Sequence, residues 1–365
     1  MSDGKIKEGS IKFYYTVGGD DRLHDIRNHL GWDFKDVLNT KELNLTHNLI
    51  APQAGFGDLM AIYDKDGVLN FRDRIVNFIR KNEKLEDFDE LTFGETVSSL
   101  QKGKTGAALN AVSPTAGMRE FIEAHPDLLA DANSRNFRAF RRMYVDKDQL
   151  VDDKKQSEEE EAQKGSNRCD FIKHILKIQR VVHLYQQRRY NEFLRQTEFK
   201  LLKAADKVQL QQHVETLCGM SDRPILEVVE YAHANGLCIM DDKYTEFVER
   251  KGYLHNRLKS VKYRSFQNLY EYLEGRTTFS TQHKIKGNEF NRVLVVLDAG
   301  GWNKYNFTYL FEDAGTASVI ERTRKLFYVC CTRAKESLAV YFHNPSDKAI
   351  KRAEAWFGSE NCIKL

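Results

Sequence analysis

The sequence predicts an α/β protein in which a strand-containing domain is interrupted by a long helical insertion. Between about residues 96 and 275 the apolar residues recur at helical spacing and strand candidates are few. Short runs rich in β-branched and aromatic residues, typical of strands, lie on either side of that region, at residues 11–17, 42–46, 293–297 and 338–342. We therefore expect residues 1–95 and 276–365 to form one discontinuous domain, with residues 96–275 inserted into it.

The helices are placed by apolar spacing and by glycine stops. The pattern predicts helices within residues 20–38, 59–82, 172–203, 263–273 and 347–357. The segment 172–203 is read as one long helix or as two helices end to end. Residues 152–167 form a charged, low-complexity run, which is typical of a solvated linker or loop.

Composition describes an ordinary globular chain. It carries 56 basic and 53 acidic residues, and this net charge of +3 neither indicates nor excludes a nucleic-acid partner. No apolar run approaches the roughly 20 residues of a membrane helix, so we expect no membrane partner and a cytoplasmic location. The six cysteines form no C-x-x-C pair, which favours reduced core thiols over a zinc site or a disulfide framework. We expect no metal site.

The stretch from residue 281 to residue 333 carries the clearest chemistry. A polar loop containing Gly287 leads into the apolar strand at residues 293–297. A predicted helix with Leu326, Phe327, Val329 and Cys330 on its apolar side then ends near Arg333. We expect Phe327 and Tyr328 to be core residues rather than stacking platforms. A glycine turn beside a strand, with a permanent cation in reach, is suited to binding a polyphosphate.

Both halves of this stretch resemble motifs of UvrD/Rep-type superfamily 1 DNA helicases. The first is similar to motif V, through residues Thr281, His283, Lys286, Gly287, Glu289, Phe290 and Val293. The second is similar to motif VI, through residues Arg324, Lys325, Leu326, Tyr328, Val329, Thr332, Arg333 and Ala334. The resemblance implies a RecA-like parallel sheet with a helical insertion, the layout of the second motor domain in that family.

The resemblance also implies roles for individual residues. Arg333 would be the arginine finger that reaches the γ-phosphate of ATP, with a surface ion pair as the alternative. Gly287 and Glu289 would lie beside the nucleotide, and Lys286 would contact phosphate. A plain turn glycine and a solvated carboxylate are the alternatives for the first two.

Two further sets of residues are candidates for single-stranded DNA contact. By resemblance, Thr281 and His283 would face the strand, with a capping threonine and a hydrogen-bonded core histidine as the alternatives. Arg188 and Arg189 lie among aromatic residues within 172–203, a mixture that can follow a nucleic-acid backbone. The alternative is an amphipathic helix whose aromatic residues are in the core and whose cations face water.

The chain departs from the family in two places. Ile50 stands where motif IV would carry a second phosphate-sensing arginine. Either the register of the motif differs here, or this arginine is missing or supplied elsewhere. No P-loop is found, because Gly103-Lys104-Thr105 lacks the upstream glycine and a preceding strand and is read as a loop. An apolar strand ending in Asp-Glu, the Mg²⁺-side motif, is also missing.

The resemblance implies the function of the C-terminal part of an ATP-dependent DNA helicase or translocase of DNA repair. We expect that this part does not hydrolyse ATP by itself. ATP and Mg²⁺ would be bound mainly by an N-terminal P-loop domain of the same protein. Single-stranded or tailed duplex DNA would be the substrate, with a nuclease or repair protein as a possible partner. The alternative is a non-catalytic helicase-like module that binds DNA or a subunit of a nuclease or defence complex.

Overall fold

The computed structural model describes residues 9–152, 166–285 and 287–365. Lys286 and most of the charged run 152–167 lie outside the described residues. The chain divides into two compact units, Met1–Gly57 with Asn268–Leu365, and Asp58–Gln267. We call the first the sheet unit and the second the helical unit, after what their described residues contain.

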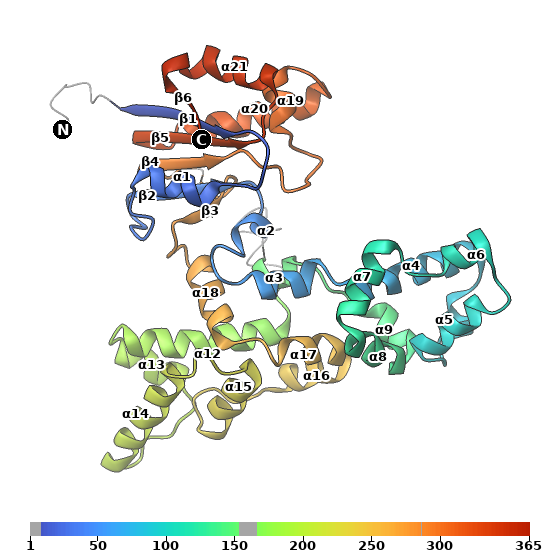
Figure 1. Cartoon of the computed structure of the whole chain (residues 1–365). Helices are drawn as coiled ribbons and strands as arrows, with labels where there is room; N and C mark the ends of the chain where they lie inside the picture. The colour runs from blue at the N-terminus through green and yellow to red at the C-terminus, as the bar shows by residue number, and fades with distance from the viewer. Residues whose placement is uncertain (1–8, 153–165, 286) are drawn as a thin grey trace. The chain divides into compact units, whose positions relative to one another are not determined.

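The sheet unit is built on six strands, all parallel, in the order β3-β2-β4-β5-β1-β6 (Figure 1). This arrangement confirms the predicted α/β class with a parallel sheet. The strands in the described residues are β1 (Ser10–Thr16), β2 (Thr40–Asn44), β3 (Phe279–Thr281), β4 (Phe290–Val296), β5 (Ala334–His343) and β6 (Cys362–Lys364).

Helices cover both faces of this sheet, which explains why its central strands are apolar on both sides. In β4, Val293 and Val295 face a core shared with α19 (Phe307–Glu312), α20 (Ala317–Cys331) and α21 (Asp347–Phe357). The alternate residues Leu294 and Val296 face α1 (Leu23–Leu30) on the other side. The prediction of a fully buried strand here is confirmed.

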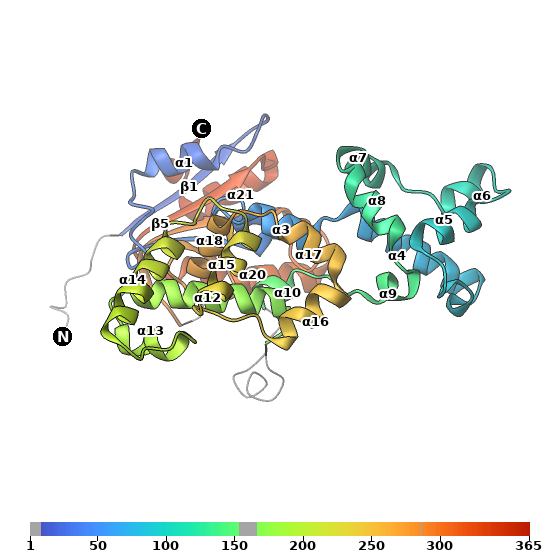
Figure 2. The ribbon, with the colours of Figure 1, turned by 90° about the horizontal axis from the view of Figure 1, so that it is seen from below.

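The described part of the helical unit contains helices and isolated bridges but no named strand. Figures 1 and 2 agree in showing α4, α5, α7 and α8 grouped together. Among the described residues, the α-helices that begin in this unit, or at its boundary, are α3 (Gly57–Asp64), α4 (Gly67–Asn82), α5 (Phe93–Gln101), α6 (Gly106–Ala111), α7 (Ala116–Ala124), α8 (Pro126–Ser134), α9 (Phe137–Arg142), α10 (Asp148–Val151), α12 (Asp170–Gln186), α13 (Tyr190–Gln196), α14 (Ala204–Cys218), α15 (Ile225–Ala234), α16 (Asp242–Arg250), α17 (Gly252–Leu258) and α18 (Tyr263–Leu273). A short 3-10 helix, η1, spans Leu85–Phe88.

One local arrangement occurs twice in the helical unit. The start of α5 pairs with the start of α9, because Phe93 N–H donates to Arg135 C=O and Phe137 N–H donates to Leu91 C=O. The starts of α15 and α18 are joined by the same reciprocal pair of bonds, at 2.8 and 2.9 Å. The four residues that open these helices are all fully buried: Phe93, Phe137, Ile225 and Tyr263. Each pair thus satisfies two N–H groups that a helix start leaves without an intrahelical partner.

The division between the units lies at residues 57/58 and 267/268, whereas the sequence places it at 95/96 and 275/276. Packing explains the difference. The side chain of Arg72 on α4 donates to the carbonyls of Phe140 and Met143, which ties this helix to α9. At the other end, Phe266 on α18 packs against Phe171 on α12. These contacts join residues that are far apart in the sequence, so the local spacing of apolar residues does not predict them.

Two helix predictions are shortened by the structure. Within residues 20–38 only α1 is helical, and it ends at Gly31, whose φ of 59° is the left-handed conformation common after a helix. Residues 172–203 form α12 and α13, with Arg188 at φ 58° between them. No helix among the described residues is long and apolar enough to span a bilayer.

Candidate functional site

Arg333 joins the two segments that resemble helicase motifs. It follows α20, and its Nε donates to the carbonyl of Val329 at 3.0 Å and its Nη2 to the hydroxyl of Thr332 at 3.0 Å. Nη1 lies 3.5 Å from the carbonyl of Asn288 in the other segment. The backbone N–H of Phe290 donates to the Arg333 carbonyl at 2.9 Å. The two segments therefore meet at the amino ends of the neighbouring strands β4 and β5.

The guanidinium of Arg333 keeps donors available for an anion. It has five N–H groups, and three of them make the contacts above. Among the residues that the structure describes, no carboxylate forms an ion pair with it. The nearby carboxylate of Glu289 instead lies 3.8 Å from the ammonium of Lys335, and both side chains are about half exposed. The predicted surface ion pair of Arg333 is thus not seen in the described residues.

The loop before β4 presents its backbone to solvent. Gly287 has φ 83°, a conformation that side chains disfavour, and no atom lies within 4 Å of where its Cβ would be. Asn288 N–H donates to the Ile285 carbonyl, closing a turn around it. Glu289 is exposed, and Lys286 cannot be placed because it is outside the described residues. A glycine is therefore favoured at position 287 because of its positive φ angle, and not because a side chain would lack room.

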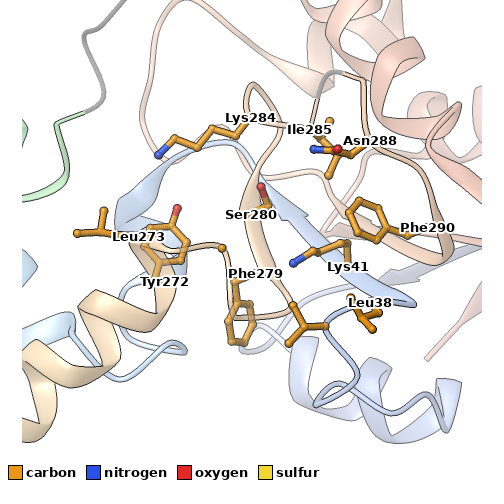
Figure 3. A pocket seen from close by; sticks show the side chains of 12 residues that line it. Leu38, Lys41, Tyr272, Leu273, Phe279, Ser280, Lys284, Ile285, Asn288 and Phe290 are labelled. Atoms are coloured by element: carbon orange, nitrogen blue, oxygen red, sulfur yellow. The ribbon is translucent and has the colours of Figure 1, made fainter. Parts of the chain in front are cut away.

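A cavity of about 360 Å³ adjoins this loop on the side of β2 and β3 (Figure 3). Lys41, Lys284, Ser280 and Asn288 supply its polar lining. Lys41 is buried, its ammonium donates to the carbonyl of Thr277, and it lies 5.4 Å from the centre of the Phe290 ring. Burial lowers the pKa of Lys41 to about 8. This lysine was not singled out from the sequence, where it directly precedes the predicted strand at residues 42–46.

Replacing Lys41 by methionine is expected to remove part of the pH dependence of stability. Between pH 8 and the ordinary lysine pKa near 10.5, the unfolded chain binds a proton that the folded chain has lost. Stability of the wild type should therefore rise with pH across this window, by about 1 kcal/mol between pH 7.5 and 9.5 after a discount for solvent screening. Urea unfolding of both proteins at the two pH values measures the difference, and parallel profiles would contradict it.

His283 and Thr281 lie at the carboxyl end of β3, and their environments differ. His283 Nε2 is 2.9 Å from the hydroxyl of Tyr305, and its ring centre is 5.7 Å from that of Trp302. The Trp302 and Tyr305 rings are themselves 5.0 Å apart. We call these three residues the aromatic cluster. Thr281 is only 2% exposed, and its hydroxyl has no hydrogen-bond partner in the described residues. It therefore does not face solvent, as a residue in contact with single-stranded DNA would.

Trp302 and Tyr305 are candidate site residues that the sequence reasoning missed. They lie in the glycine-containing loop after β4, where aromatic residues alternate with Lys304. The guanidinium of Arg322 donates to the Lys304 carbonyl at 3.0 Å, which places a second cation beside this loop. Interleaved aromatic and basic residues in a glycine-rich loop were the available signal.

The basic pair in the helical unit is less suited to a phosphate track. Arg189 forms a double contact with Glu192 in the same turn, at 2.7 and 2.5 Å, so its charge is already compensated. Arg188 forms no ion pair in the described residues. Of the neighbouring aromatics, Phe193 is in the core while Tyr190 is 51% exposed. One arginine and one tyrosine thus remain as surface groups.

The structure shows the two positions at which the sequence departs from the helicase family. Ile50, at the expected arginine position of motif IV, is fully buried in α2 (His47–Ile50), so this position cannot reach a phosphate. Gly103-Lys104-Thr105 lies between α5 and α6 and is a loop, as predicted. The ammonium of Lys104 donates to the Leu100 carbonyl and lies 5.6 Å from the Phe78 ring.

One expectation within the second motif was wrong. Phe327 and Tyr328 were both predicted to be core residues, and Phe327 is. Tyr328 is 69% exposed, because α20 turns this position away from the sheet that buries Phe327 and Cys330.

Among the described residues, no group of three histidine, cysteine or acidic side chains is arranged to hold a metal ion. All six cysteines are free thiols in the structure. No protein-family model matches the chain, and a search of curated proteins finds no relative. The helicase resemblance therefore rests on the quoted residues and on where the structure places them.

Proposed function

We propose that the chain is the second motor domain of an ATP-dependent DNA helicase or translocase. In this proposal Arg333 completes a nucleotide site whose P-loop and Mg²⁺ ligands belong to another domain of the same protein. The chain also contributes part of the track for single-stranded DNA. It would not hydrolyse ATP by itself.

The meeting of the two motif segments carries this proposal. Arg333 and Asn288 are 45 positions apart, yet the Arg333 side chain reaches the Asn288 carbonyl beside the open backbone of Gly287. A guanidinium with unused donors beside an exposed glycine turn is suited to phosphate oxygens. Glu289 is exposed next to them. In the proposed site its carboxylate would accept hydrogen bonds from the ribose hydroxyls of the nucleotide.

The aromatic cluster supports the DNA part of the proposal. It lies beyond the carboxyl ends of β3 and β4, whereas Arg333 lies at the amino ends of β4 and β5. The residues that contact the nucleotide and those that contact single-stranded DNA would therefore lie at opposite edges of one sheet. A rigid sheet between them offers a direct mechanical connection.

Replacing Trp302 by alanine is expected to weaken single-stranded DNA binding by roughly 5- to 150-fold, because stacking of one base contributes about 1–3 kcal/mol. Fluorescence anisotropy of a labelled oligonucleotide measures the dissociation constant. Trp302→Phe should keep most of the affinity, since the ring face remains. Trp356→Ala, on α21 and outside the cluster, is the control and should bind like the wild type.

A DNA-binding module without catalysis is the second candidate function. The burial of Ile50 favours it, since the motif IV position supplies no arginine to a nucleotide. The two functions differ in one assay, DNA-stimulated ATP hydrolysis by a protein that joins this chain to a P-loop domain. Hydrolysis that requires both parts supports the motor. Binding of DNA without any hydrolysis in the joined protein would replace it with the module.

A further inference from the structure

A second cavity, of about 320 Å³, lies at the carboxyl edge of the sheet. It is formed by the ends of β4 and β5 and by residues that follow β1 and β4. We call it the edge crevice. Its polar lining comes from Asp21, Asp298, Asn306, Thr308 and His343 together with the Tyr341 hydroxyl, and neither motif segment contributes to it.

The topology of the sheet explains why a crevice forms here. The neighbouring strands β1 and β5 send the chain to opposite faces, since β1 leads to α1 and β5 leads to α21. Where adjacent parallel strands diverge in this way, a crevice opens outside their carboxyl ends, and ligands of open α/β sheets bind at that point. The edge crevice is at this switch point.

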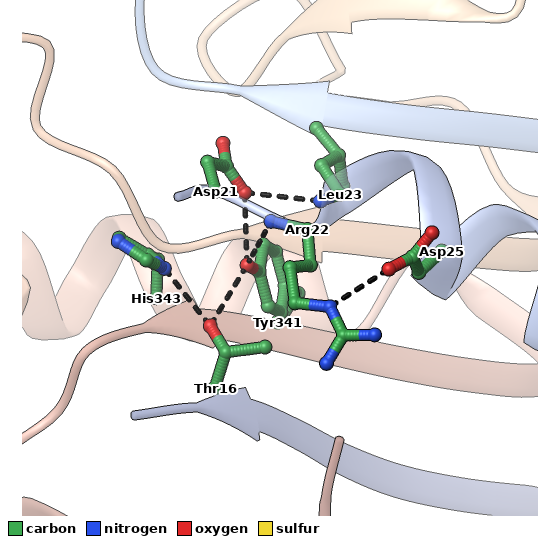
Figure 4. A network of polar contacts seen from close by, with 7 residues as sticks. All are labelled: Thr16, Asp21, Arg22, Leu23, Asp25, Tyr341 and His343. Carbon is green, nitrogen blue, oxygen red and sulfur yellow. Dashed lines mark hydrogen bonds and ion pairs between the residues drawn. The ribbon is translucent and has the colours of Figure 1, made fainter. Parts of the chain in front are cut away.

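A chain of hydrogen bonds fixes the chemistry of its wall (Figure 4). Tyr341 has a single O–H, which it donates to Asp21 Oδ1 at 2.8 Å. The Thr16 hydroxyl, 3.1 Å away, must then donate to the Tyr341 oxygen, which also accepts the N–H of Arg22. Because the hydrogen of Thr16 is used, His343 Nδ1 donates to its oxygen at 2.9 Å. Burial raises the pKa of Tyr341, which keeps this O–H in place.

The consequence is a wall that accepts hydrogen bonds. In an imidazole that carries its single hydrogen on Nδ1, Nε2 is an acceptor. Asp21 Oδ1 already accepts from Tyr341 and from Leu23 N–H, which orients the carboxylate and leaves Oδ2 for a ligand. Asp298 is held in the same way by Gly300 N–H.

The charge of the lining residues narrows the class of ligand that the edge crevice can bind. Of the residues that the structure describes, two carboxylates and no lysine or arginine line the edge crevice. A phosphate would be repelled, whereas a neutral group with N–H donors would be held. Phe307, Phe342 and Leu297 add apolar surface suited to a flat ring. The volume is near the lower end of the range for small-ligand pockets.

We propose that the edge crevice binds a nucleobase that carries an exocyclic amino group, in preference to thymine or uracil. Asp21 and Asp298 would accept from the amino group, the pairing by which carboxylates recognise cytosine N4. The base would come from the DNA strand or from a free nucleoside. The first source rests on the proposed DNA function, and the second does not.

The test compares labelled dC and dT oligonucleotides of equal length with the full chain, by fluorescence anisotropy at one salt concentration. We expect dC to bind more tightly by roughly 5- to 150-fold, the discrimination of one base-edge contact. Asp21→Asn should abolish the preference and leave dT binding unchanged. Asp25→Asn removes the same charge from α1 outside the crevice, and should keep the preference. Asp298→Asn provides a second crevice variant if Asp21→Asn fails to fold.

Saturation-transfer NMR with cytidine and thymidine separates the two sources. Binding of cytidine that Asp21→Asn removes would support the edge crevice even if neither oligonucleotide binds, and only the DNA function would then fail. Equal binding of dC and dT without any cytidine signal would overturn the inference. An unchanged dC preference in both crevice variants would overturn it as well.

Discussion

Replacement of Arg333 by alanine is expected to lower DNA-stimulated ATP hydrolysis on the order of 10³- to 10⁵-fold in a protein that joins this chain to a P-loop domain. In the proposed role, the guanidinium would stabilise charge on the transferred phosphoryl group only in the transition state, so the loss should appear in kcat. Nucleotide affinity should change little. Steady-state hydrolysis and the binding of a fluorescent ATP analogue measure the two quantities.

Arg324 provides the matched control for this substitution. It is on α20, the helix that precedes Arg333, but its side chain is 58% exposed and pairs with Glu321 three residues earlier. Arg324→Ala should therefore leave hydrolysis within a few-fold of the wild type. Arg333→Lys should remain strongly impaired, because a lysine cannot reproduce the planar set of N–H donors. Full activity in either Arg333 variant would exclude the finger role.

Local patterns predicted the elements whose packing is set by their own sequence. The helix expected at residues 347–357 is α21, with the same bounds, and Ser346 caps it by accepting from Ala349 N–H. The apolar run that became β4 was equally clear, because both of its faces are buried. In these cases spacing and burial give the same answer.

Features that depend on distant residues were not predictable in this way. The paired helix starts in the helical unit join residues more than 35 positions apart, through backbone groups that carry no side-chain signature. The unit boundary was misplaced for the same reason. Burial of Tyr253 and Arg257 around Asp66 is likewise a product of tertiary packing.

The candidate site shows the same division. Arg333, Gly287 and Glu289 were found from motifs, and the structure places them at the amino ends of β4 and β5. Trp302 was missed because no motif contains it, and Lys41 because its burial follows from the cavity around it. Sequence motifs identify residues whose type is constrained by the chemistry. Residues that line a pocket or form a cluster are recognised only in the folded structure.

Replacing Asp66 by alanine is expected to lower the free energy of unfolding of the helical unit by about 3–5 kcal/mol. Asp66 is buried and caps α4, where Oδ1 accepts from Val68 N–H at 2.8 Å and Leu69 N–H at 3.0 Å. Its Oδ2 accepts from the Tyr253 hydroxyl at 2.9 Å and pairs with Arg257, whose side chain is only 9% exposed. Removing the carboxylate leaves a buried guanidinium without its charge partner.

The exposed pair of Asp222 and Arg264 tests whether burial is the cause. Its geometry is as favourable, with two contacts at 2.8 and 3.1 Å, but both side chains are more than half exposed. Asp222→Ala should cost no more than about 1 kcal/mol, because solvent screens the pair. Urea unfolding followed by circular dichroism measures both variants. Equal losses would mean that the cap and ion pair of Asp66 gain nothing from burial, and that α4 is held to α17 by apolar packing alone.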